Sequence, residues 1–149
     1  MSESVETVIV TREVSRFPRT IGMILAIVGI LLMLAGVATY ITVSKTVSDE
    51  CITTTADACL PNRSVTGPFT AYCQAQVIAK HTAEATGGKT YAELAKDDPL
   101  RQTAMTSSFL RSSLFTSVVA FGLAALAILV GALFTLTGVA LRKLQRDLV

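Results

Sequence analysis

Hydrophobic residues are concentrated in two long blocks of the chain, at residues 21–43 and 114–141. Neither block contains Asp, Glu, Lys, Arg or His. At about 1.5 Å per residue the blocks would extend roughly 34 and 42 Å as helices, enough to cross a hydrocarbon core of about 30 Å. The sequence therefore predicts an all-α membrane protein whose two transmembrane helices form an antiparallel hairpin.

Overall composition agrees with this pattern. Hydrophobic residues make up 51% of the 149 residues and charged residues only 16%, which is too apolar for a small soluble domain. A secretory signal peptide is the alternative for the first block, since arginines precede it and the small residues Gly36 and Ala38 lie near its end. The block is longer than a usual signal-peptide core, which favours a transmembrane helix.

Positive charges flank the two blocks on the sides away from the segment between them. These charges are Arg12, Arg16, Arg19, Arg142, Lys143 and Arg146. The intervening segment carries seven Lys or Arg and seven Asp or Glu, and only Arg111 lies close outside the second block. The positive-inside rule therefore predicts a multi-pass protein of the plasma (inner) membrane with both termini in the cytoplasm.

This topology divides the chain into five regions. They are a cytoplasmic tail at 1–19, a transmembrane helix at 20–43, an extracytoplasmic domain at 44–113, a transmembrane helix at 114–141 and a cytoplasmic tail at 142–149. The net charge of +2 follows from the flanking charges. No basic groove with interleaved aromatic residues is apparent, so we expect no nucleic-acid partner.

Small residues recur at helical spacing along one side of each predicted span. The first stripe contains Gly22, Ala26, Gly29 and Gly36, and the second contains Ser117, Ala120, Ala124, Ala127, Gly131, Thr135 and Gly138. Such stripes allow helix backbones to approach closely in lipid. Two interpretations remain open: the stripes pack against each other within one chain, or one stripe contacts a partner subunit or a second copy. Since neither span contains a charged residue, the chain alone is not expected to be a pump, a carrier or a proton channel.

The segment between the spans is predicted to form a small helical domain. Residues 45–67 indicate an irregular loop, and a helix is expected at about 69–86, after Pro68 and before two glycines. A capping-box pattern from Thr90 to Glu93 predicts a brief helix at about 91–96. A further helix at 99–113 is expected to continue into the second span.

Three cysteines lie in this segment, where an exterior location favours a disulfide. Cys51 with Cys59 is the default pair, and Cys59 with Cys73 is the alternative. The third thiol would stay free or form an intermolecular bond. The chain has one histidine, His81, and no CxxC motif, so a metal site is not expected.

Four runs of the sequence carry a resemblance, at residues 67–72, 83–92, 97–101 and 108–122. They resemble a family of small actinobacterial membrane proteins with two spans. The resemblance implies an actinobacterial inner membrane. Members often carry the label aromatic ring-opening dioxygenase, but ring cleavage by non-haem iron needs two His and a carboxylate, and this chain has His81 alone.

No catalytic motif stands out. There is no phosphate-binding glycine loop, no GxSxG and no nucleophile with a recognisable His and acid pair. We therefore expect a non-enzymatic protein without a cofactor, which contacts membrane lipid and acts as an accessory or assembly subunit of a larger envelope or respiratory complex. The alternatives are a self-assembling scaffold or channel and, third, a thiol-redox protein.

Overall fold

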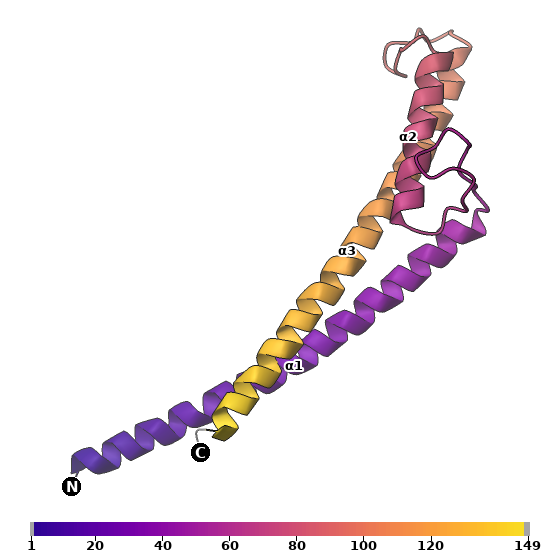
Figure 1. Cartoon of the computed structure of the whole chain (residues 1–149). Coiled ribbons are helices and arrows are strands. Elements are labelled where there is room, and N and C mark those ends of the chain that lie inside the picture. Colours follow the sequence, from indigo (N-terminus) through magenta and orange to yellow (C-terminus); the bar gives the residue numbers. More distant parts are fainter. Residues whose placement is uncertain (1, 148–149) are drawn as a thin grey trace. The chain divides into compact units, whose positions relative to one another are not determined.

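The computed structural model describes residues 2–147, with side chains described for residues 19–144. Three helices form its regular structure (Figure 1): α1 (Ser2–Asp49), α2 (Pro68–Ala85) and α3 (Leu100–Asp147). The described residues contain no strand beyond an isolated bridge between Thr53 and Ser64. The predicted all-α class is therefore confirmed.

Two of these helices contain stretches that are long and apolar enough to cross a membrane, as the sequence predicts. The candidate spans are Arg19–Asp49 in α1 and Leu100–Leu144 in α3. Among the flanking charges used to predict orientation, the side chains of Arg12, Arg16 and Arg146 lie outside the described residues.

The first helix extends further than predicted. Residues 45–49 belong to α1, so the irregular loop expected from residue 45 is wrong over these positions. Val47, in this extension, is only 7% exposed and belongs to a hydrophobic core. Tertiary packing therefore overrides the weak helix preference of the Thr and Ser residues beside it.

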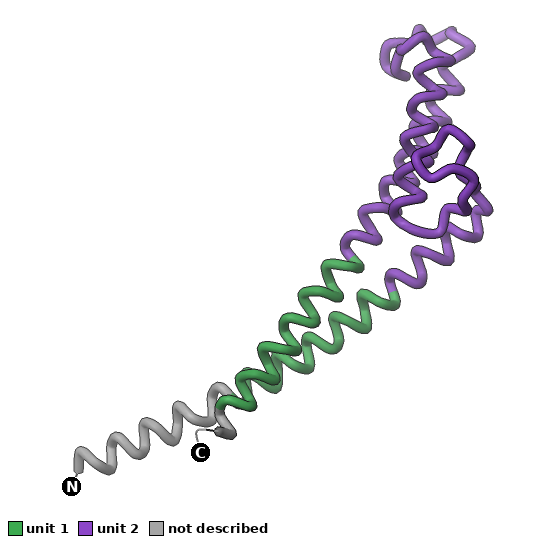
Figure 2. Tube along the Cα trace, in the orientation of Figure 1, with its two compact units in different colours: residues 1–38, 124–149 green, residues 39–123 purple. Residues whose placement is uncertain are grey.

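The chain forms two compact units, which Figure 2 distinguishes by colour. Unit 1 contains residues 1–38 and 124–149, and unit 2 contains residues 39–123. Both long helices contribute to each unit, whereas α2 and its flanking segments belong to unit 2. The segment predicted to lie outside the membrane, residues 44–113, is therefore part of unit 2.

Glycines bring the backbones of α1 and α3 into contact in unit 1. A methyl group added at Gly29 would lie 2.5 Å from the Gly131 carbonyl oxygen, and one added at Gly131 would lie 2.6 Å from the Gly29 carbonyl oxygen. No larger residue fits without moving backbone, because these distances are well inside van der Waals contact. Such close approach strengthens dispersion and weak polar contacts between helices.

The same kind of contact is repeated elsewhere in unit 1. A methyl group at Gly22 would lie 2.8 Å from the Gly138 carbonyl oxygen, and one at Gly36 would lie 2.8 Å from the Ala124 carbonyl oxygen. Residues later in α1 contact residues earlier in α3, so the two segments run antiparallel within this unit. All four residues belong to the small-residue stripes identified in the sequence.

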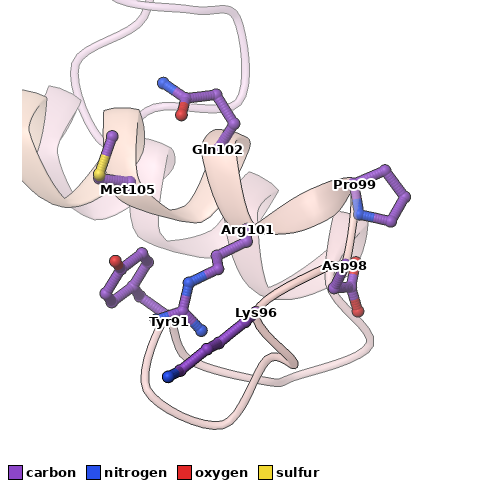
Figure 3. Close-up of a pocket in the computed structure, with 7 residues that line it drawn as sticks. All are labelled: Tyr91, Lys96, Asp98, Pro99, Arg101, Gln102 and Met105. Carbon is purple, nitrogen blue, oxygen red and sulfur yellow. The ribbon is translucent and has the colours of Figure 1, made fainter.

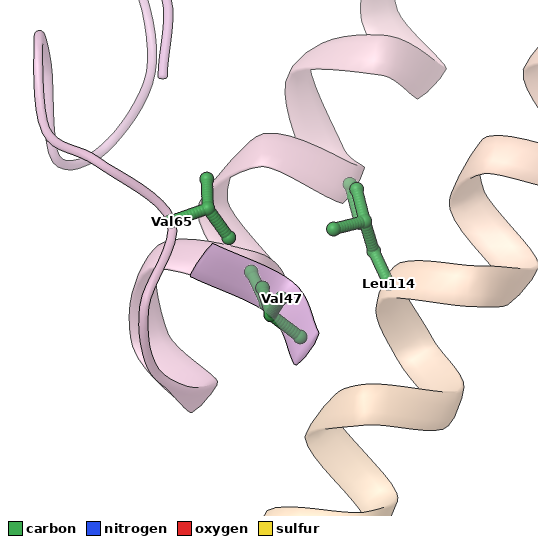
Figure 4. Close-up of a cluster of buried hydrophobic side chains, with 5 residues drawn as sticks. Val47, Val65 and Leu114 are labelled. Atoms are coloured by element: carbon green, nitrogen blue, oxygen red, sulfur yellow. The ribbon is translucent and has the colours of Figure 1, made fainter. Parts of the chain in front are cut away.

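A hydrophobic core holds α2 in unit 2 (Figure 4). It combines Val47 from α1, Val65 from the loop, Ala71 and Ala75 from α2, and Leu114 from α3. Both alanines have no exposed surface, so their small side chains allow α2 to lie close to its neighbours. The partly buried residues packed against this core are Val43, Ile52, Ile78, Phe115 and Val118.

The boundaries of α2 follow from local backbone chemistry. Pro68 occupies the first helical turn, after Gly67 in an extended conformation. At the other end, Gly87 and Gly88 adopt φ values of +62° and +82°, which stop the helix in a conformation that glycine adopts without strain.

The brief helix predicted at 91–96 is wrong, because these residues form turns. Its predicted capping contact is nevertheless present: the Glu93 carboxylate accepts hydrogen bonds from the Thr90 backbone N–H at 2.7 Å and from the Thr90 hydroxyl at 2.8 Å. Pro99 disfavours a helical conformation at Asp98, and so short a segment forms too few hydrogen bonds to overcome helix nucleation.

Substitution of Gly131 by Ala should destabilise unit 1, because the added methyl group would overlap the Gly29 backbone. We expect the free energy of unfolding to fall by about 1–3 kcal/mol, the usual effect of overpacking, in denaturant titrations of the full chain in detergent micelles. The matched control is Gly122→Ala on the same helix, where an added methyl group meets no atom within 4 Å. Equal effects of the two substitutions would contradict the close helix contact.

Candidate functional site

A disulfide attaches the loop after α1 to α2. Cys59 and Cys73 are bonded, with Cα atoms 5.4 Å apart, and Cys51 is a free, exposed thiol. The default pairing of Cys51 with Cys59 is therefore wrong, and the alternative pairing is the one that forms. The reason is tertiary: α2 packs beside the loop and presents the buried Cys73 to it, a proximity that sequence spacing does not reveal.

A polar contact also joins this loop to α2. Asp57 Oδ2 lies 2.9 Å from His81 Nε2 and 3.4 Å from Lys80 Nζ. The hydroxyl of Thr55 and the ring of His81 hold the pKa of the Asp57 carboxyl well below its ordinary value. The carboxylate therefore stays ionised throughout the physiological range and can hold both basic side chains near the loop.

This cluster does not assemble a recognisable catalytic site. A hydrolytic triad needs a Ser, Thr or Cys bonded to the second ring nitrogen of the histidine, and among the described residues no such bond to His81 is present. The same part of the chain contains no group of three His, Cys, Asp or Glu residues placed to hold a metal ion. The geometry supports a structural contact, in which His81 and Lys80 fasten the loop to α2.

A surface cavity of about 310 Å³ lies where the turns after α2 lead into α3 (Figure 3). Its lining includes Tyr91, Lys96, Arg101 and Met105. The Arg101 guanidinium carbon lies 4.1 Å from the centre of the Tyr91 ring, a distance typical of a cation–π contact. Asp98 also borders the cavity, and its carboxylate caps α3.

Two aromatic side chains of unit 2 are conspicuously exposed. Phe69 on α2 is 77% exposed, and Phe109 on α3 is 69% exposed. Tyr72 is 46% exposed and contacts the Phe115 ring, with centroids 6.1 Å apart. Aromatic side chains are enriched where a protein surface is covered by another molecule.

The structure places the sequence-derived candidates in two groups. In unit 1 the first stripe meets part of the second, at Ala124, Gly131 and Gly138. Ala120 and the three cysteines lie in unit 2. Sequence reasoning missed the contact of His81 with Asp57, since 24 positions separate them. It also missed the cavity, because no local pattern signals that Lys96 and Tyr91 border it.

The ionisation of Asp57 should depend on His81. In carbon NMR titrations of the full chain in micelles, we expect the Asp57 carboxyl to titrate below the ordinary Asp pKa of about 3.9. Replacing His81 by Gln should move that midpoint upward, because one hydrogen bond to the ionised form is lost.

The lowered pKa of Asp57 makes the stability of the folded protein depend on pH. The stabilising contribution of Asp57 is fully present above the ordinary Asp pKa, and it is lost as the pH falls through the lower pKa of the folded state. The stability difference between the natural protein and Asp57→Asn should therefore shrink on acidification. A midpoint near 3.9 in the natural protein, unchanged by His81→Gln, would contradict this contact.

Comparisons of this chain with protein-family models, with curated proteins and with solved structures give no match.

Proposed function

We propose that this protein is a non-catalytic accessory or assembly subunit of a larger membrane complex, of the envelope or respiratory type. Two membrane-spanning helices in an antiparallel hairpin anchor it in the inner membrane of an actinobacterium. Unit 2 contains the extracytoplasmic domain, which contacts the partner. The observation that carries the proposal is the exposure of two phenylalanines of unit 2, Phe69 and Phe109, neither of which belongs to its hydrophobic core.

The membrane location rests on the exposed surfaces of the apolar helices. Leu31 and Leu34 of α1 are 60% and 62% exposed, and Leu123 and Leu133 of α3 are 61% and 63% exposed. Water contact with such a surface is unfavourable by about 25 cal/mol for each Å² of apolar area. Lipid solvates the same surface without this penalty.

The proposed orientation rests on two further observations. Arg19 precedes the apolar stretch of α1, and Arg142 and Lys143 follow the apolar stretch of α3. The positive-inside rule assigns such flanking charges to the cytoplasmic side. The disulfide between Cys59 and Cys73 lies in unit 2, and disulfides persist in oxidising compartments outside the cytoplasm.

A self-assembling scaffold or channel is the alternative function. In that function, copies of the chain would pack through their small-residue stripes. The glycines of these stripes already contact one another within unit 1, which leaves less of the stripes for a second copy and favours the accessory subunit. A thiol-redox function is third, since Cys59 and Cys73 are 14 positions apart and lack the CxxC spacing of redox motifs.

The orientation predicts selective labelling of one cysteine. In intact cells, a membrane-impermeant maleimide should label Cys51 without prior reduction, because this thiol is free and exposed, whereas Cys59 and Cys73 should react only after reduction. As a control, a cysteine placed at Lys143 in a Cys51→Ser background should remain unlabelled until the cells are permeabilised. Labelling of position 143 but not of Cys51 in intact cells would reverse the proposed topology.

The accessory function predicts a stable complex. Extraction of the tagged full chain in a mild detergent, followed by affinity purification and mass spectrometry, should recover unrelated subunits in fixed ratio. Replacing Phe69 and Phe109 together by Ala should reduce that recovery at least tenfold, because burial of one large apolar side chain contributes about 1.5–3 kcal/mol.

The matched control is a double replacement of Leu123 and Leu133 by Ala, which removes exposed apolar side chains that lipid would cover. This control should leave the recovery of partners unchanged, and intact Cys59–Cys73 bonding should show that unit 2 remains folded in both variants. Recovery of several copies of the chain alone would support the self-assembling scaffold instead. Recovery of a single copy alone would exclude both functions.

A further inference from the structure

The cavity at the start of α3 contains two positively charged side chains from different parts of unit 2. Lys96 comes from the turns before α3, and Arg101 comes from its first turn. In Figure 3 both side chains extend toward the Tyr91 side of the cavity, whereas Asp98 lies on the opposite side. Two positive charges on one side of a cavity repel each other, and a negative charge bound between them offsets this repulsion.

Arg101 is held in place by contacts that leave part of its guanidinium available. Its Nη1 donates a hydrogen bond to the Leu94 carbonyl oxygen at 2.5 Å, and the group stacks over the Tyr91 ring at 4.1 Å. A guanidinium has five N–H donors, and this backbone bond accounts for one of them. The remaining donors form the planar fork that binds the two oxygens of a carboxylate or phosphate.

No carboxylate forms an ion pair with Lys96 or Arg101 among the described residues. Asp98 Oδ1 accepts a hydrogen bond from the Leu100 backbone N–H at 2.8 Å, so it caps the first turn of α3. Lys96 forms no ion pair or hydrogen bond within the part of the chain that the structure describes. Its ammonium therefore supplies a second, uncommitted set of donors at the cavity.

The remaining walls determine the class of ligand. Tyr91 and Met105 supply apolar surface, and Gln102 supplies an amide that both donates and accepts hydrogen bonds. The volume of about 310 Å³ lies at the small end of ligand sites. We propose that this cavity binds a sugar-sized organic molecule through one anionic group, a phosphate or a carboxylate, held between Arg101 and Lys96.

The test uses the full chain in a zwitterionic detergent and three probes that share a sugar ring. Glucose 1-phosphate and glucuronate carry the two candidate anionic groups, and glucose carries none. At moderate ionic strength, at least one anionic probe should cause saturable NMR shifts in residues 91–105, and glucose should not. Binding of the phosphate probe alone or of the carboxylate probe alone supports the site and identifies its anion.

Substitutions can separate the effect of positive charge on binding from the effect of the planar Arg101 guanidinium. Lys96→Gln should weaken binding about tenfold, the usual effect of losing one charged hydrogen bond, without disturbing the fold, since its side chain makes no bond to be lost. Arg101→Lys retains the charge but removes the planar fork, and it should weaken binding by a similar factor. The matched control is Lys89→Gln, which removes one positive charge from the same connecting segment but not from the cavity.

Three outcomes would overturn the site. The first is the absence of saturable shifts with either anionic probe, and the second is an equal response to glucose. The third is an equal loss of affinity in Lys89→Gln and Lys96→Gln, which would indicate diffuse attraction to a positive surface. Each outcome is independent of the recovery of partner subunits, so the cavity and the accessory function are tested separately.

Discussion

Contact between apolar side chains and water is the constraint on which the rest of this structure depends. The long helices expose leucine, isoleucine and valine over most of their apolar stretches, and few of these residues are buried inside the protein. Lipid removes this unfavourable contact, but it offers the backbone no hydrogen-bond partners. Continuous helices satisfy both demands, because every peptide group in their interior bonds within the same helix.

No hydrophobic force acts between helices in lipid, so helix association there depends more on close packing. In unit 1, Gly29 and Gly131 let the two backbones touch, so attraction arises from many short contacts rather than from the burial of large side chains. Unit 2 is instead stabilised by the burial of larger apolar side chains. There, Val65 and Leu114 form a conventional hydrophobic core, and a disulfide and the Asp57 cluster add further connections between loop and helix.

Much of the fold could be predicted because it follows from local chemistry. The two apolar stretches are defined by the absence of charge, and the ends of α2 by Pro68, Gly87 and Gly88. One prediction failed because of a tertiary contact: Val47 keeps α1 helical beyond the expected boundary by joining the core. Another failed for a local reason. The capping pattern at Thr90 and Glu93 forms a turn, but the segment before Pro99 is too short to nucleate a helix.

The candidate sites were less predictable than the fold, because tertiary contacts form them. The contacts of Cys59 with Cys73, of Asp57 with His81 and of Arg101 with Tyr91 each bring together residues separated by ten or more positions. The cysteines were recognised as a set, but their pairing depends on where α2 lies. Spacing along the sequence does not reveal the position of α2, because tertiary packing determines that position.

The pairing of Cys59 with Cys73 has a consequence for how the protein matures. Cys51 is nearer to Cys59 in the sequence, so in an unfolded chain the shorter loop between them closes with the smaller loss of entropy. Under oxidising conditions the unfolded chain can therefore acquire this non-native bond first. The thiolate of Cys73 can then displace Cys51 by thiol–disulfide exchange once α2 has docked. Oxidative folding along this route needs isomerisation of the disulfide as well as oxidation.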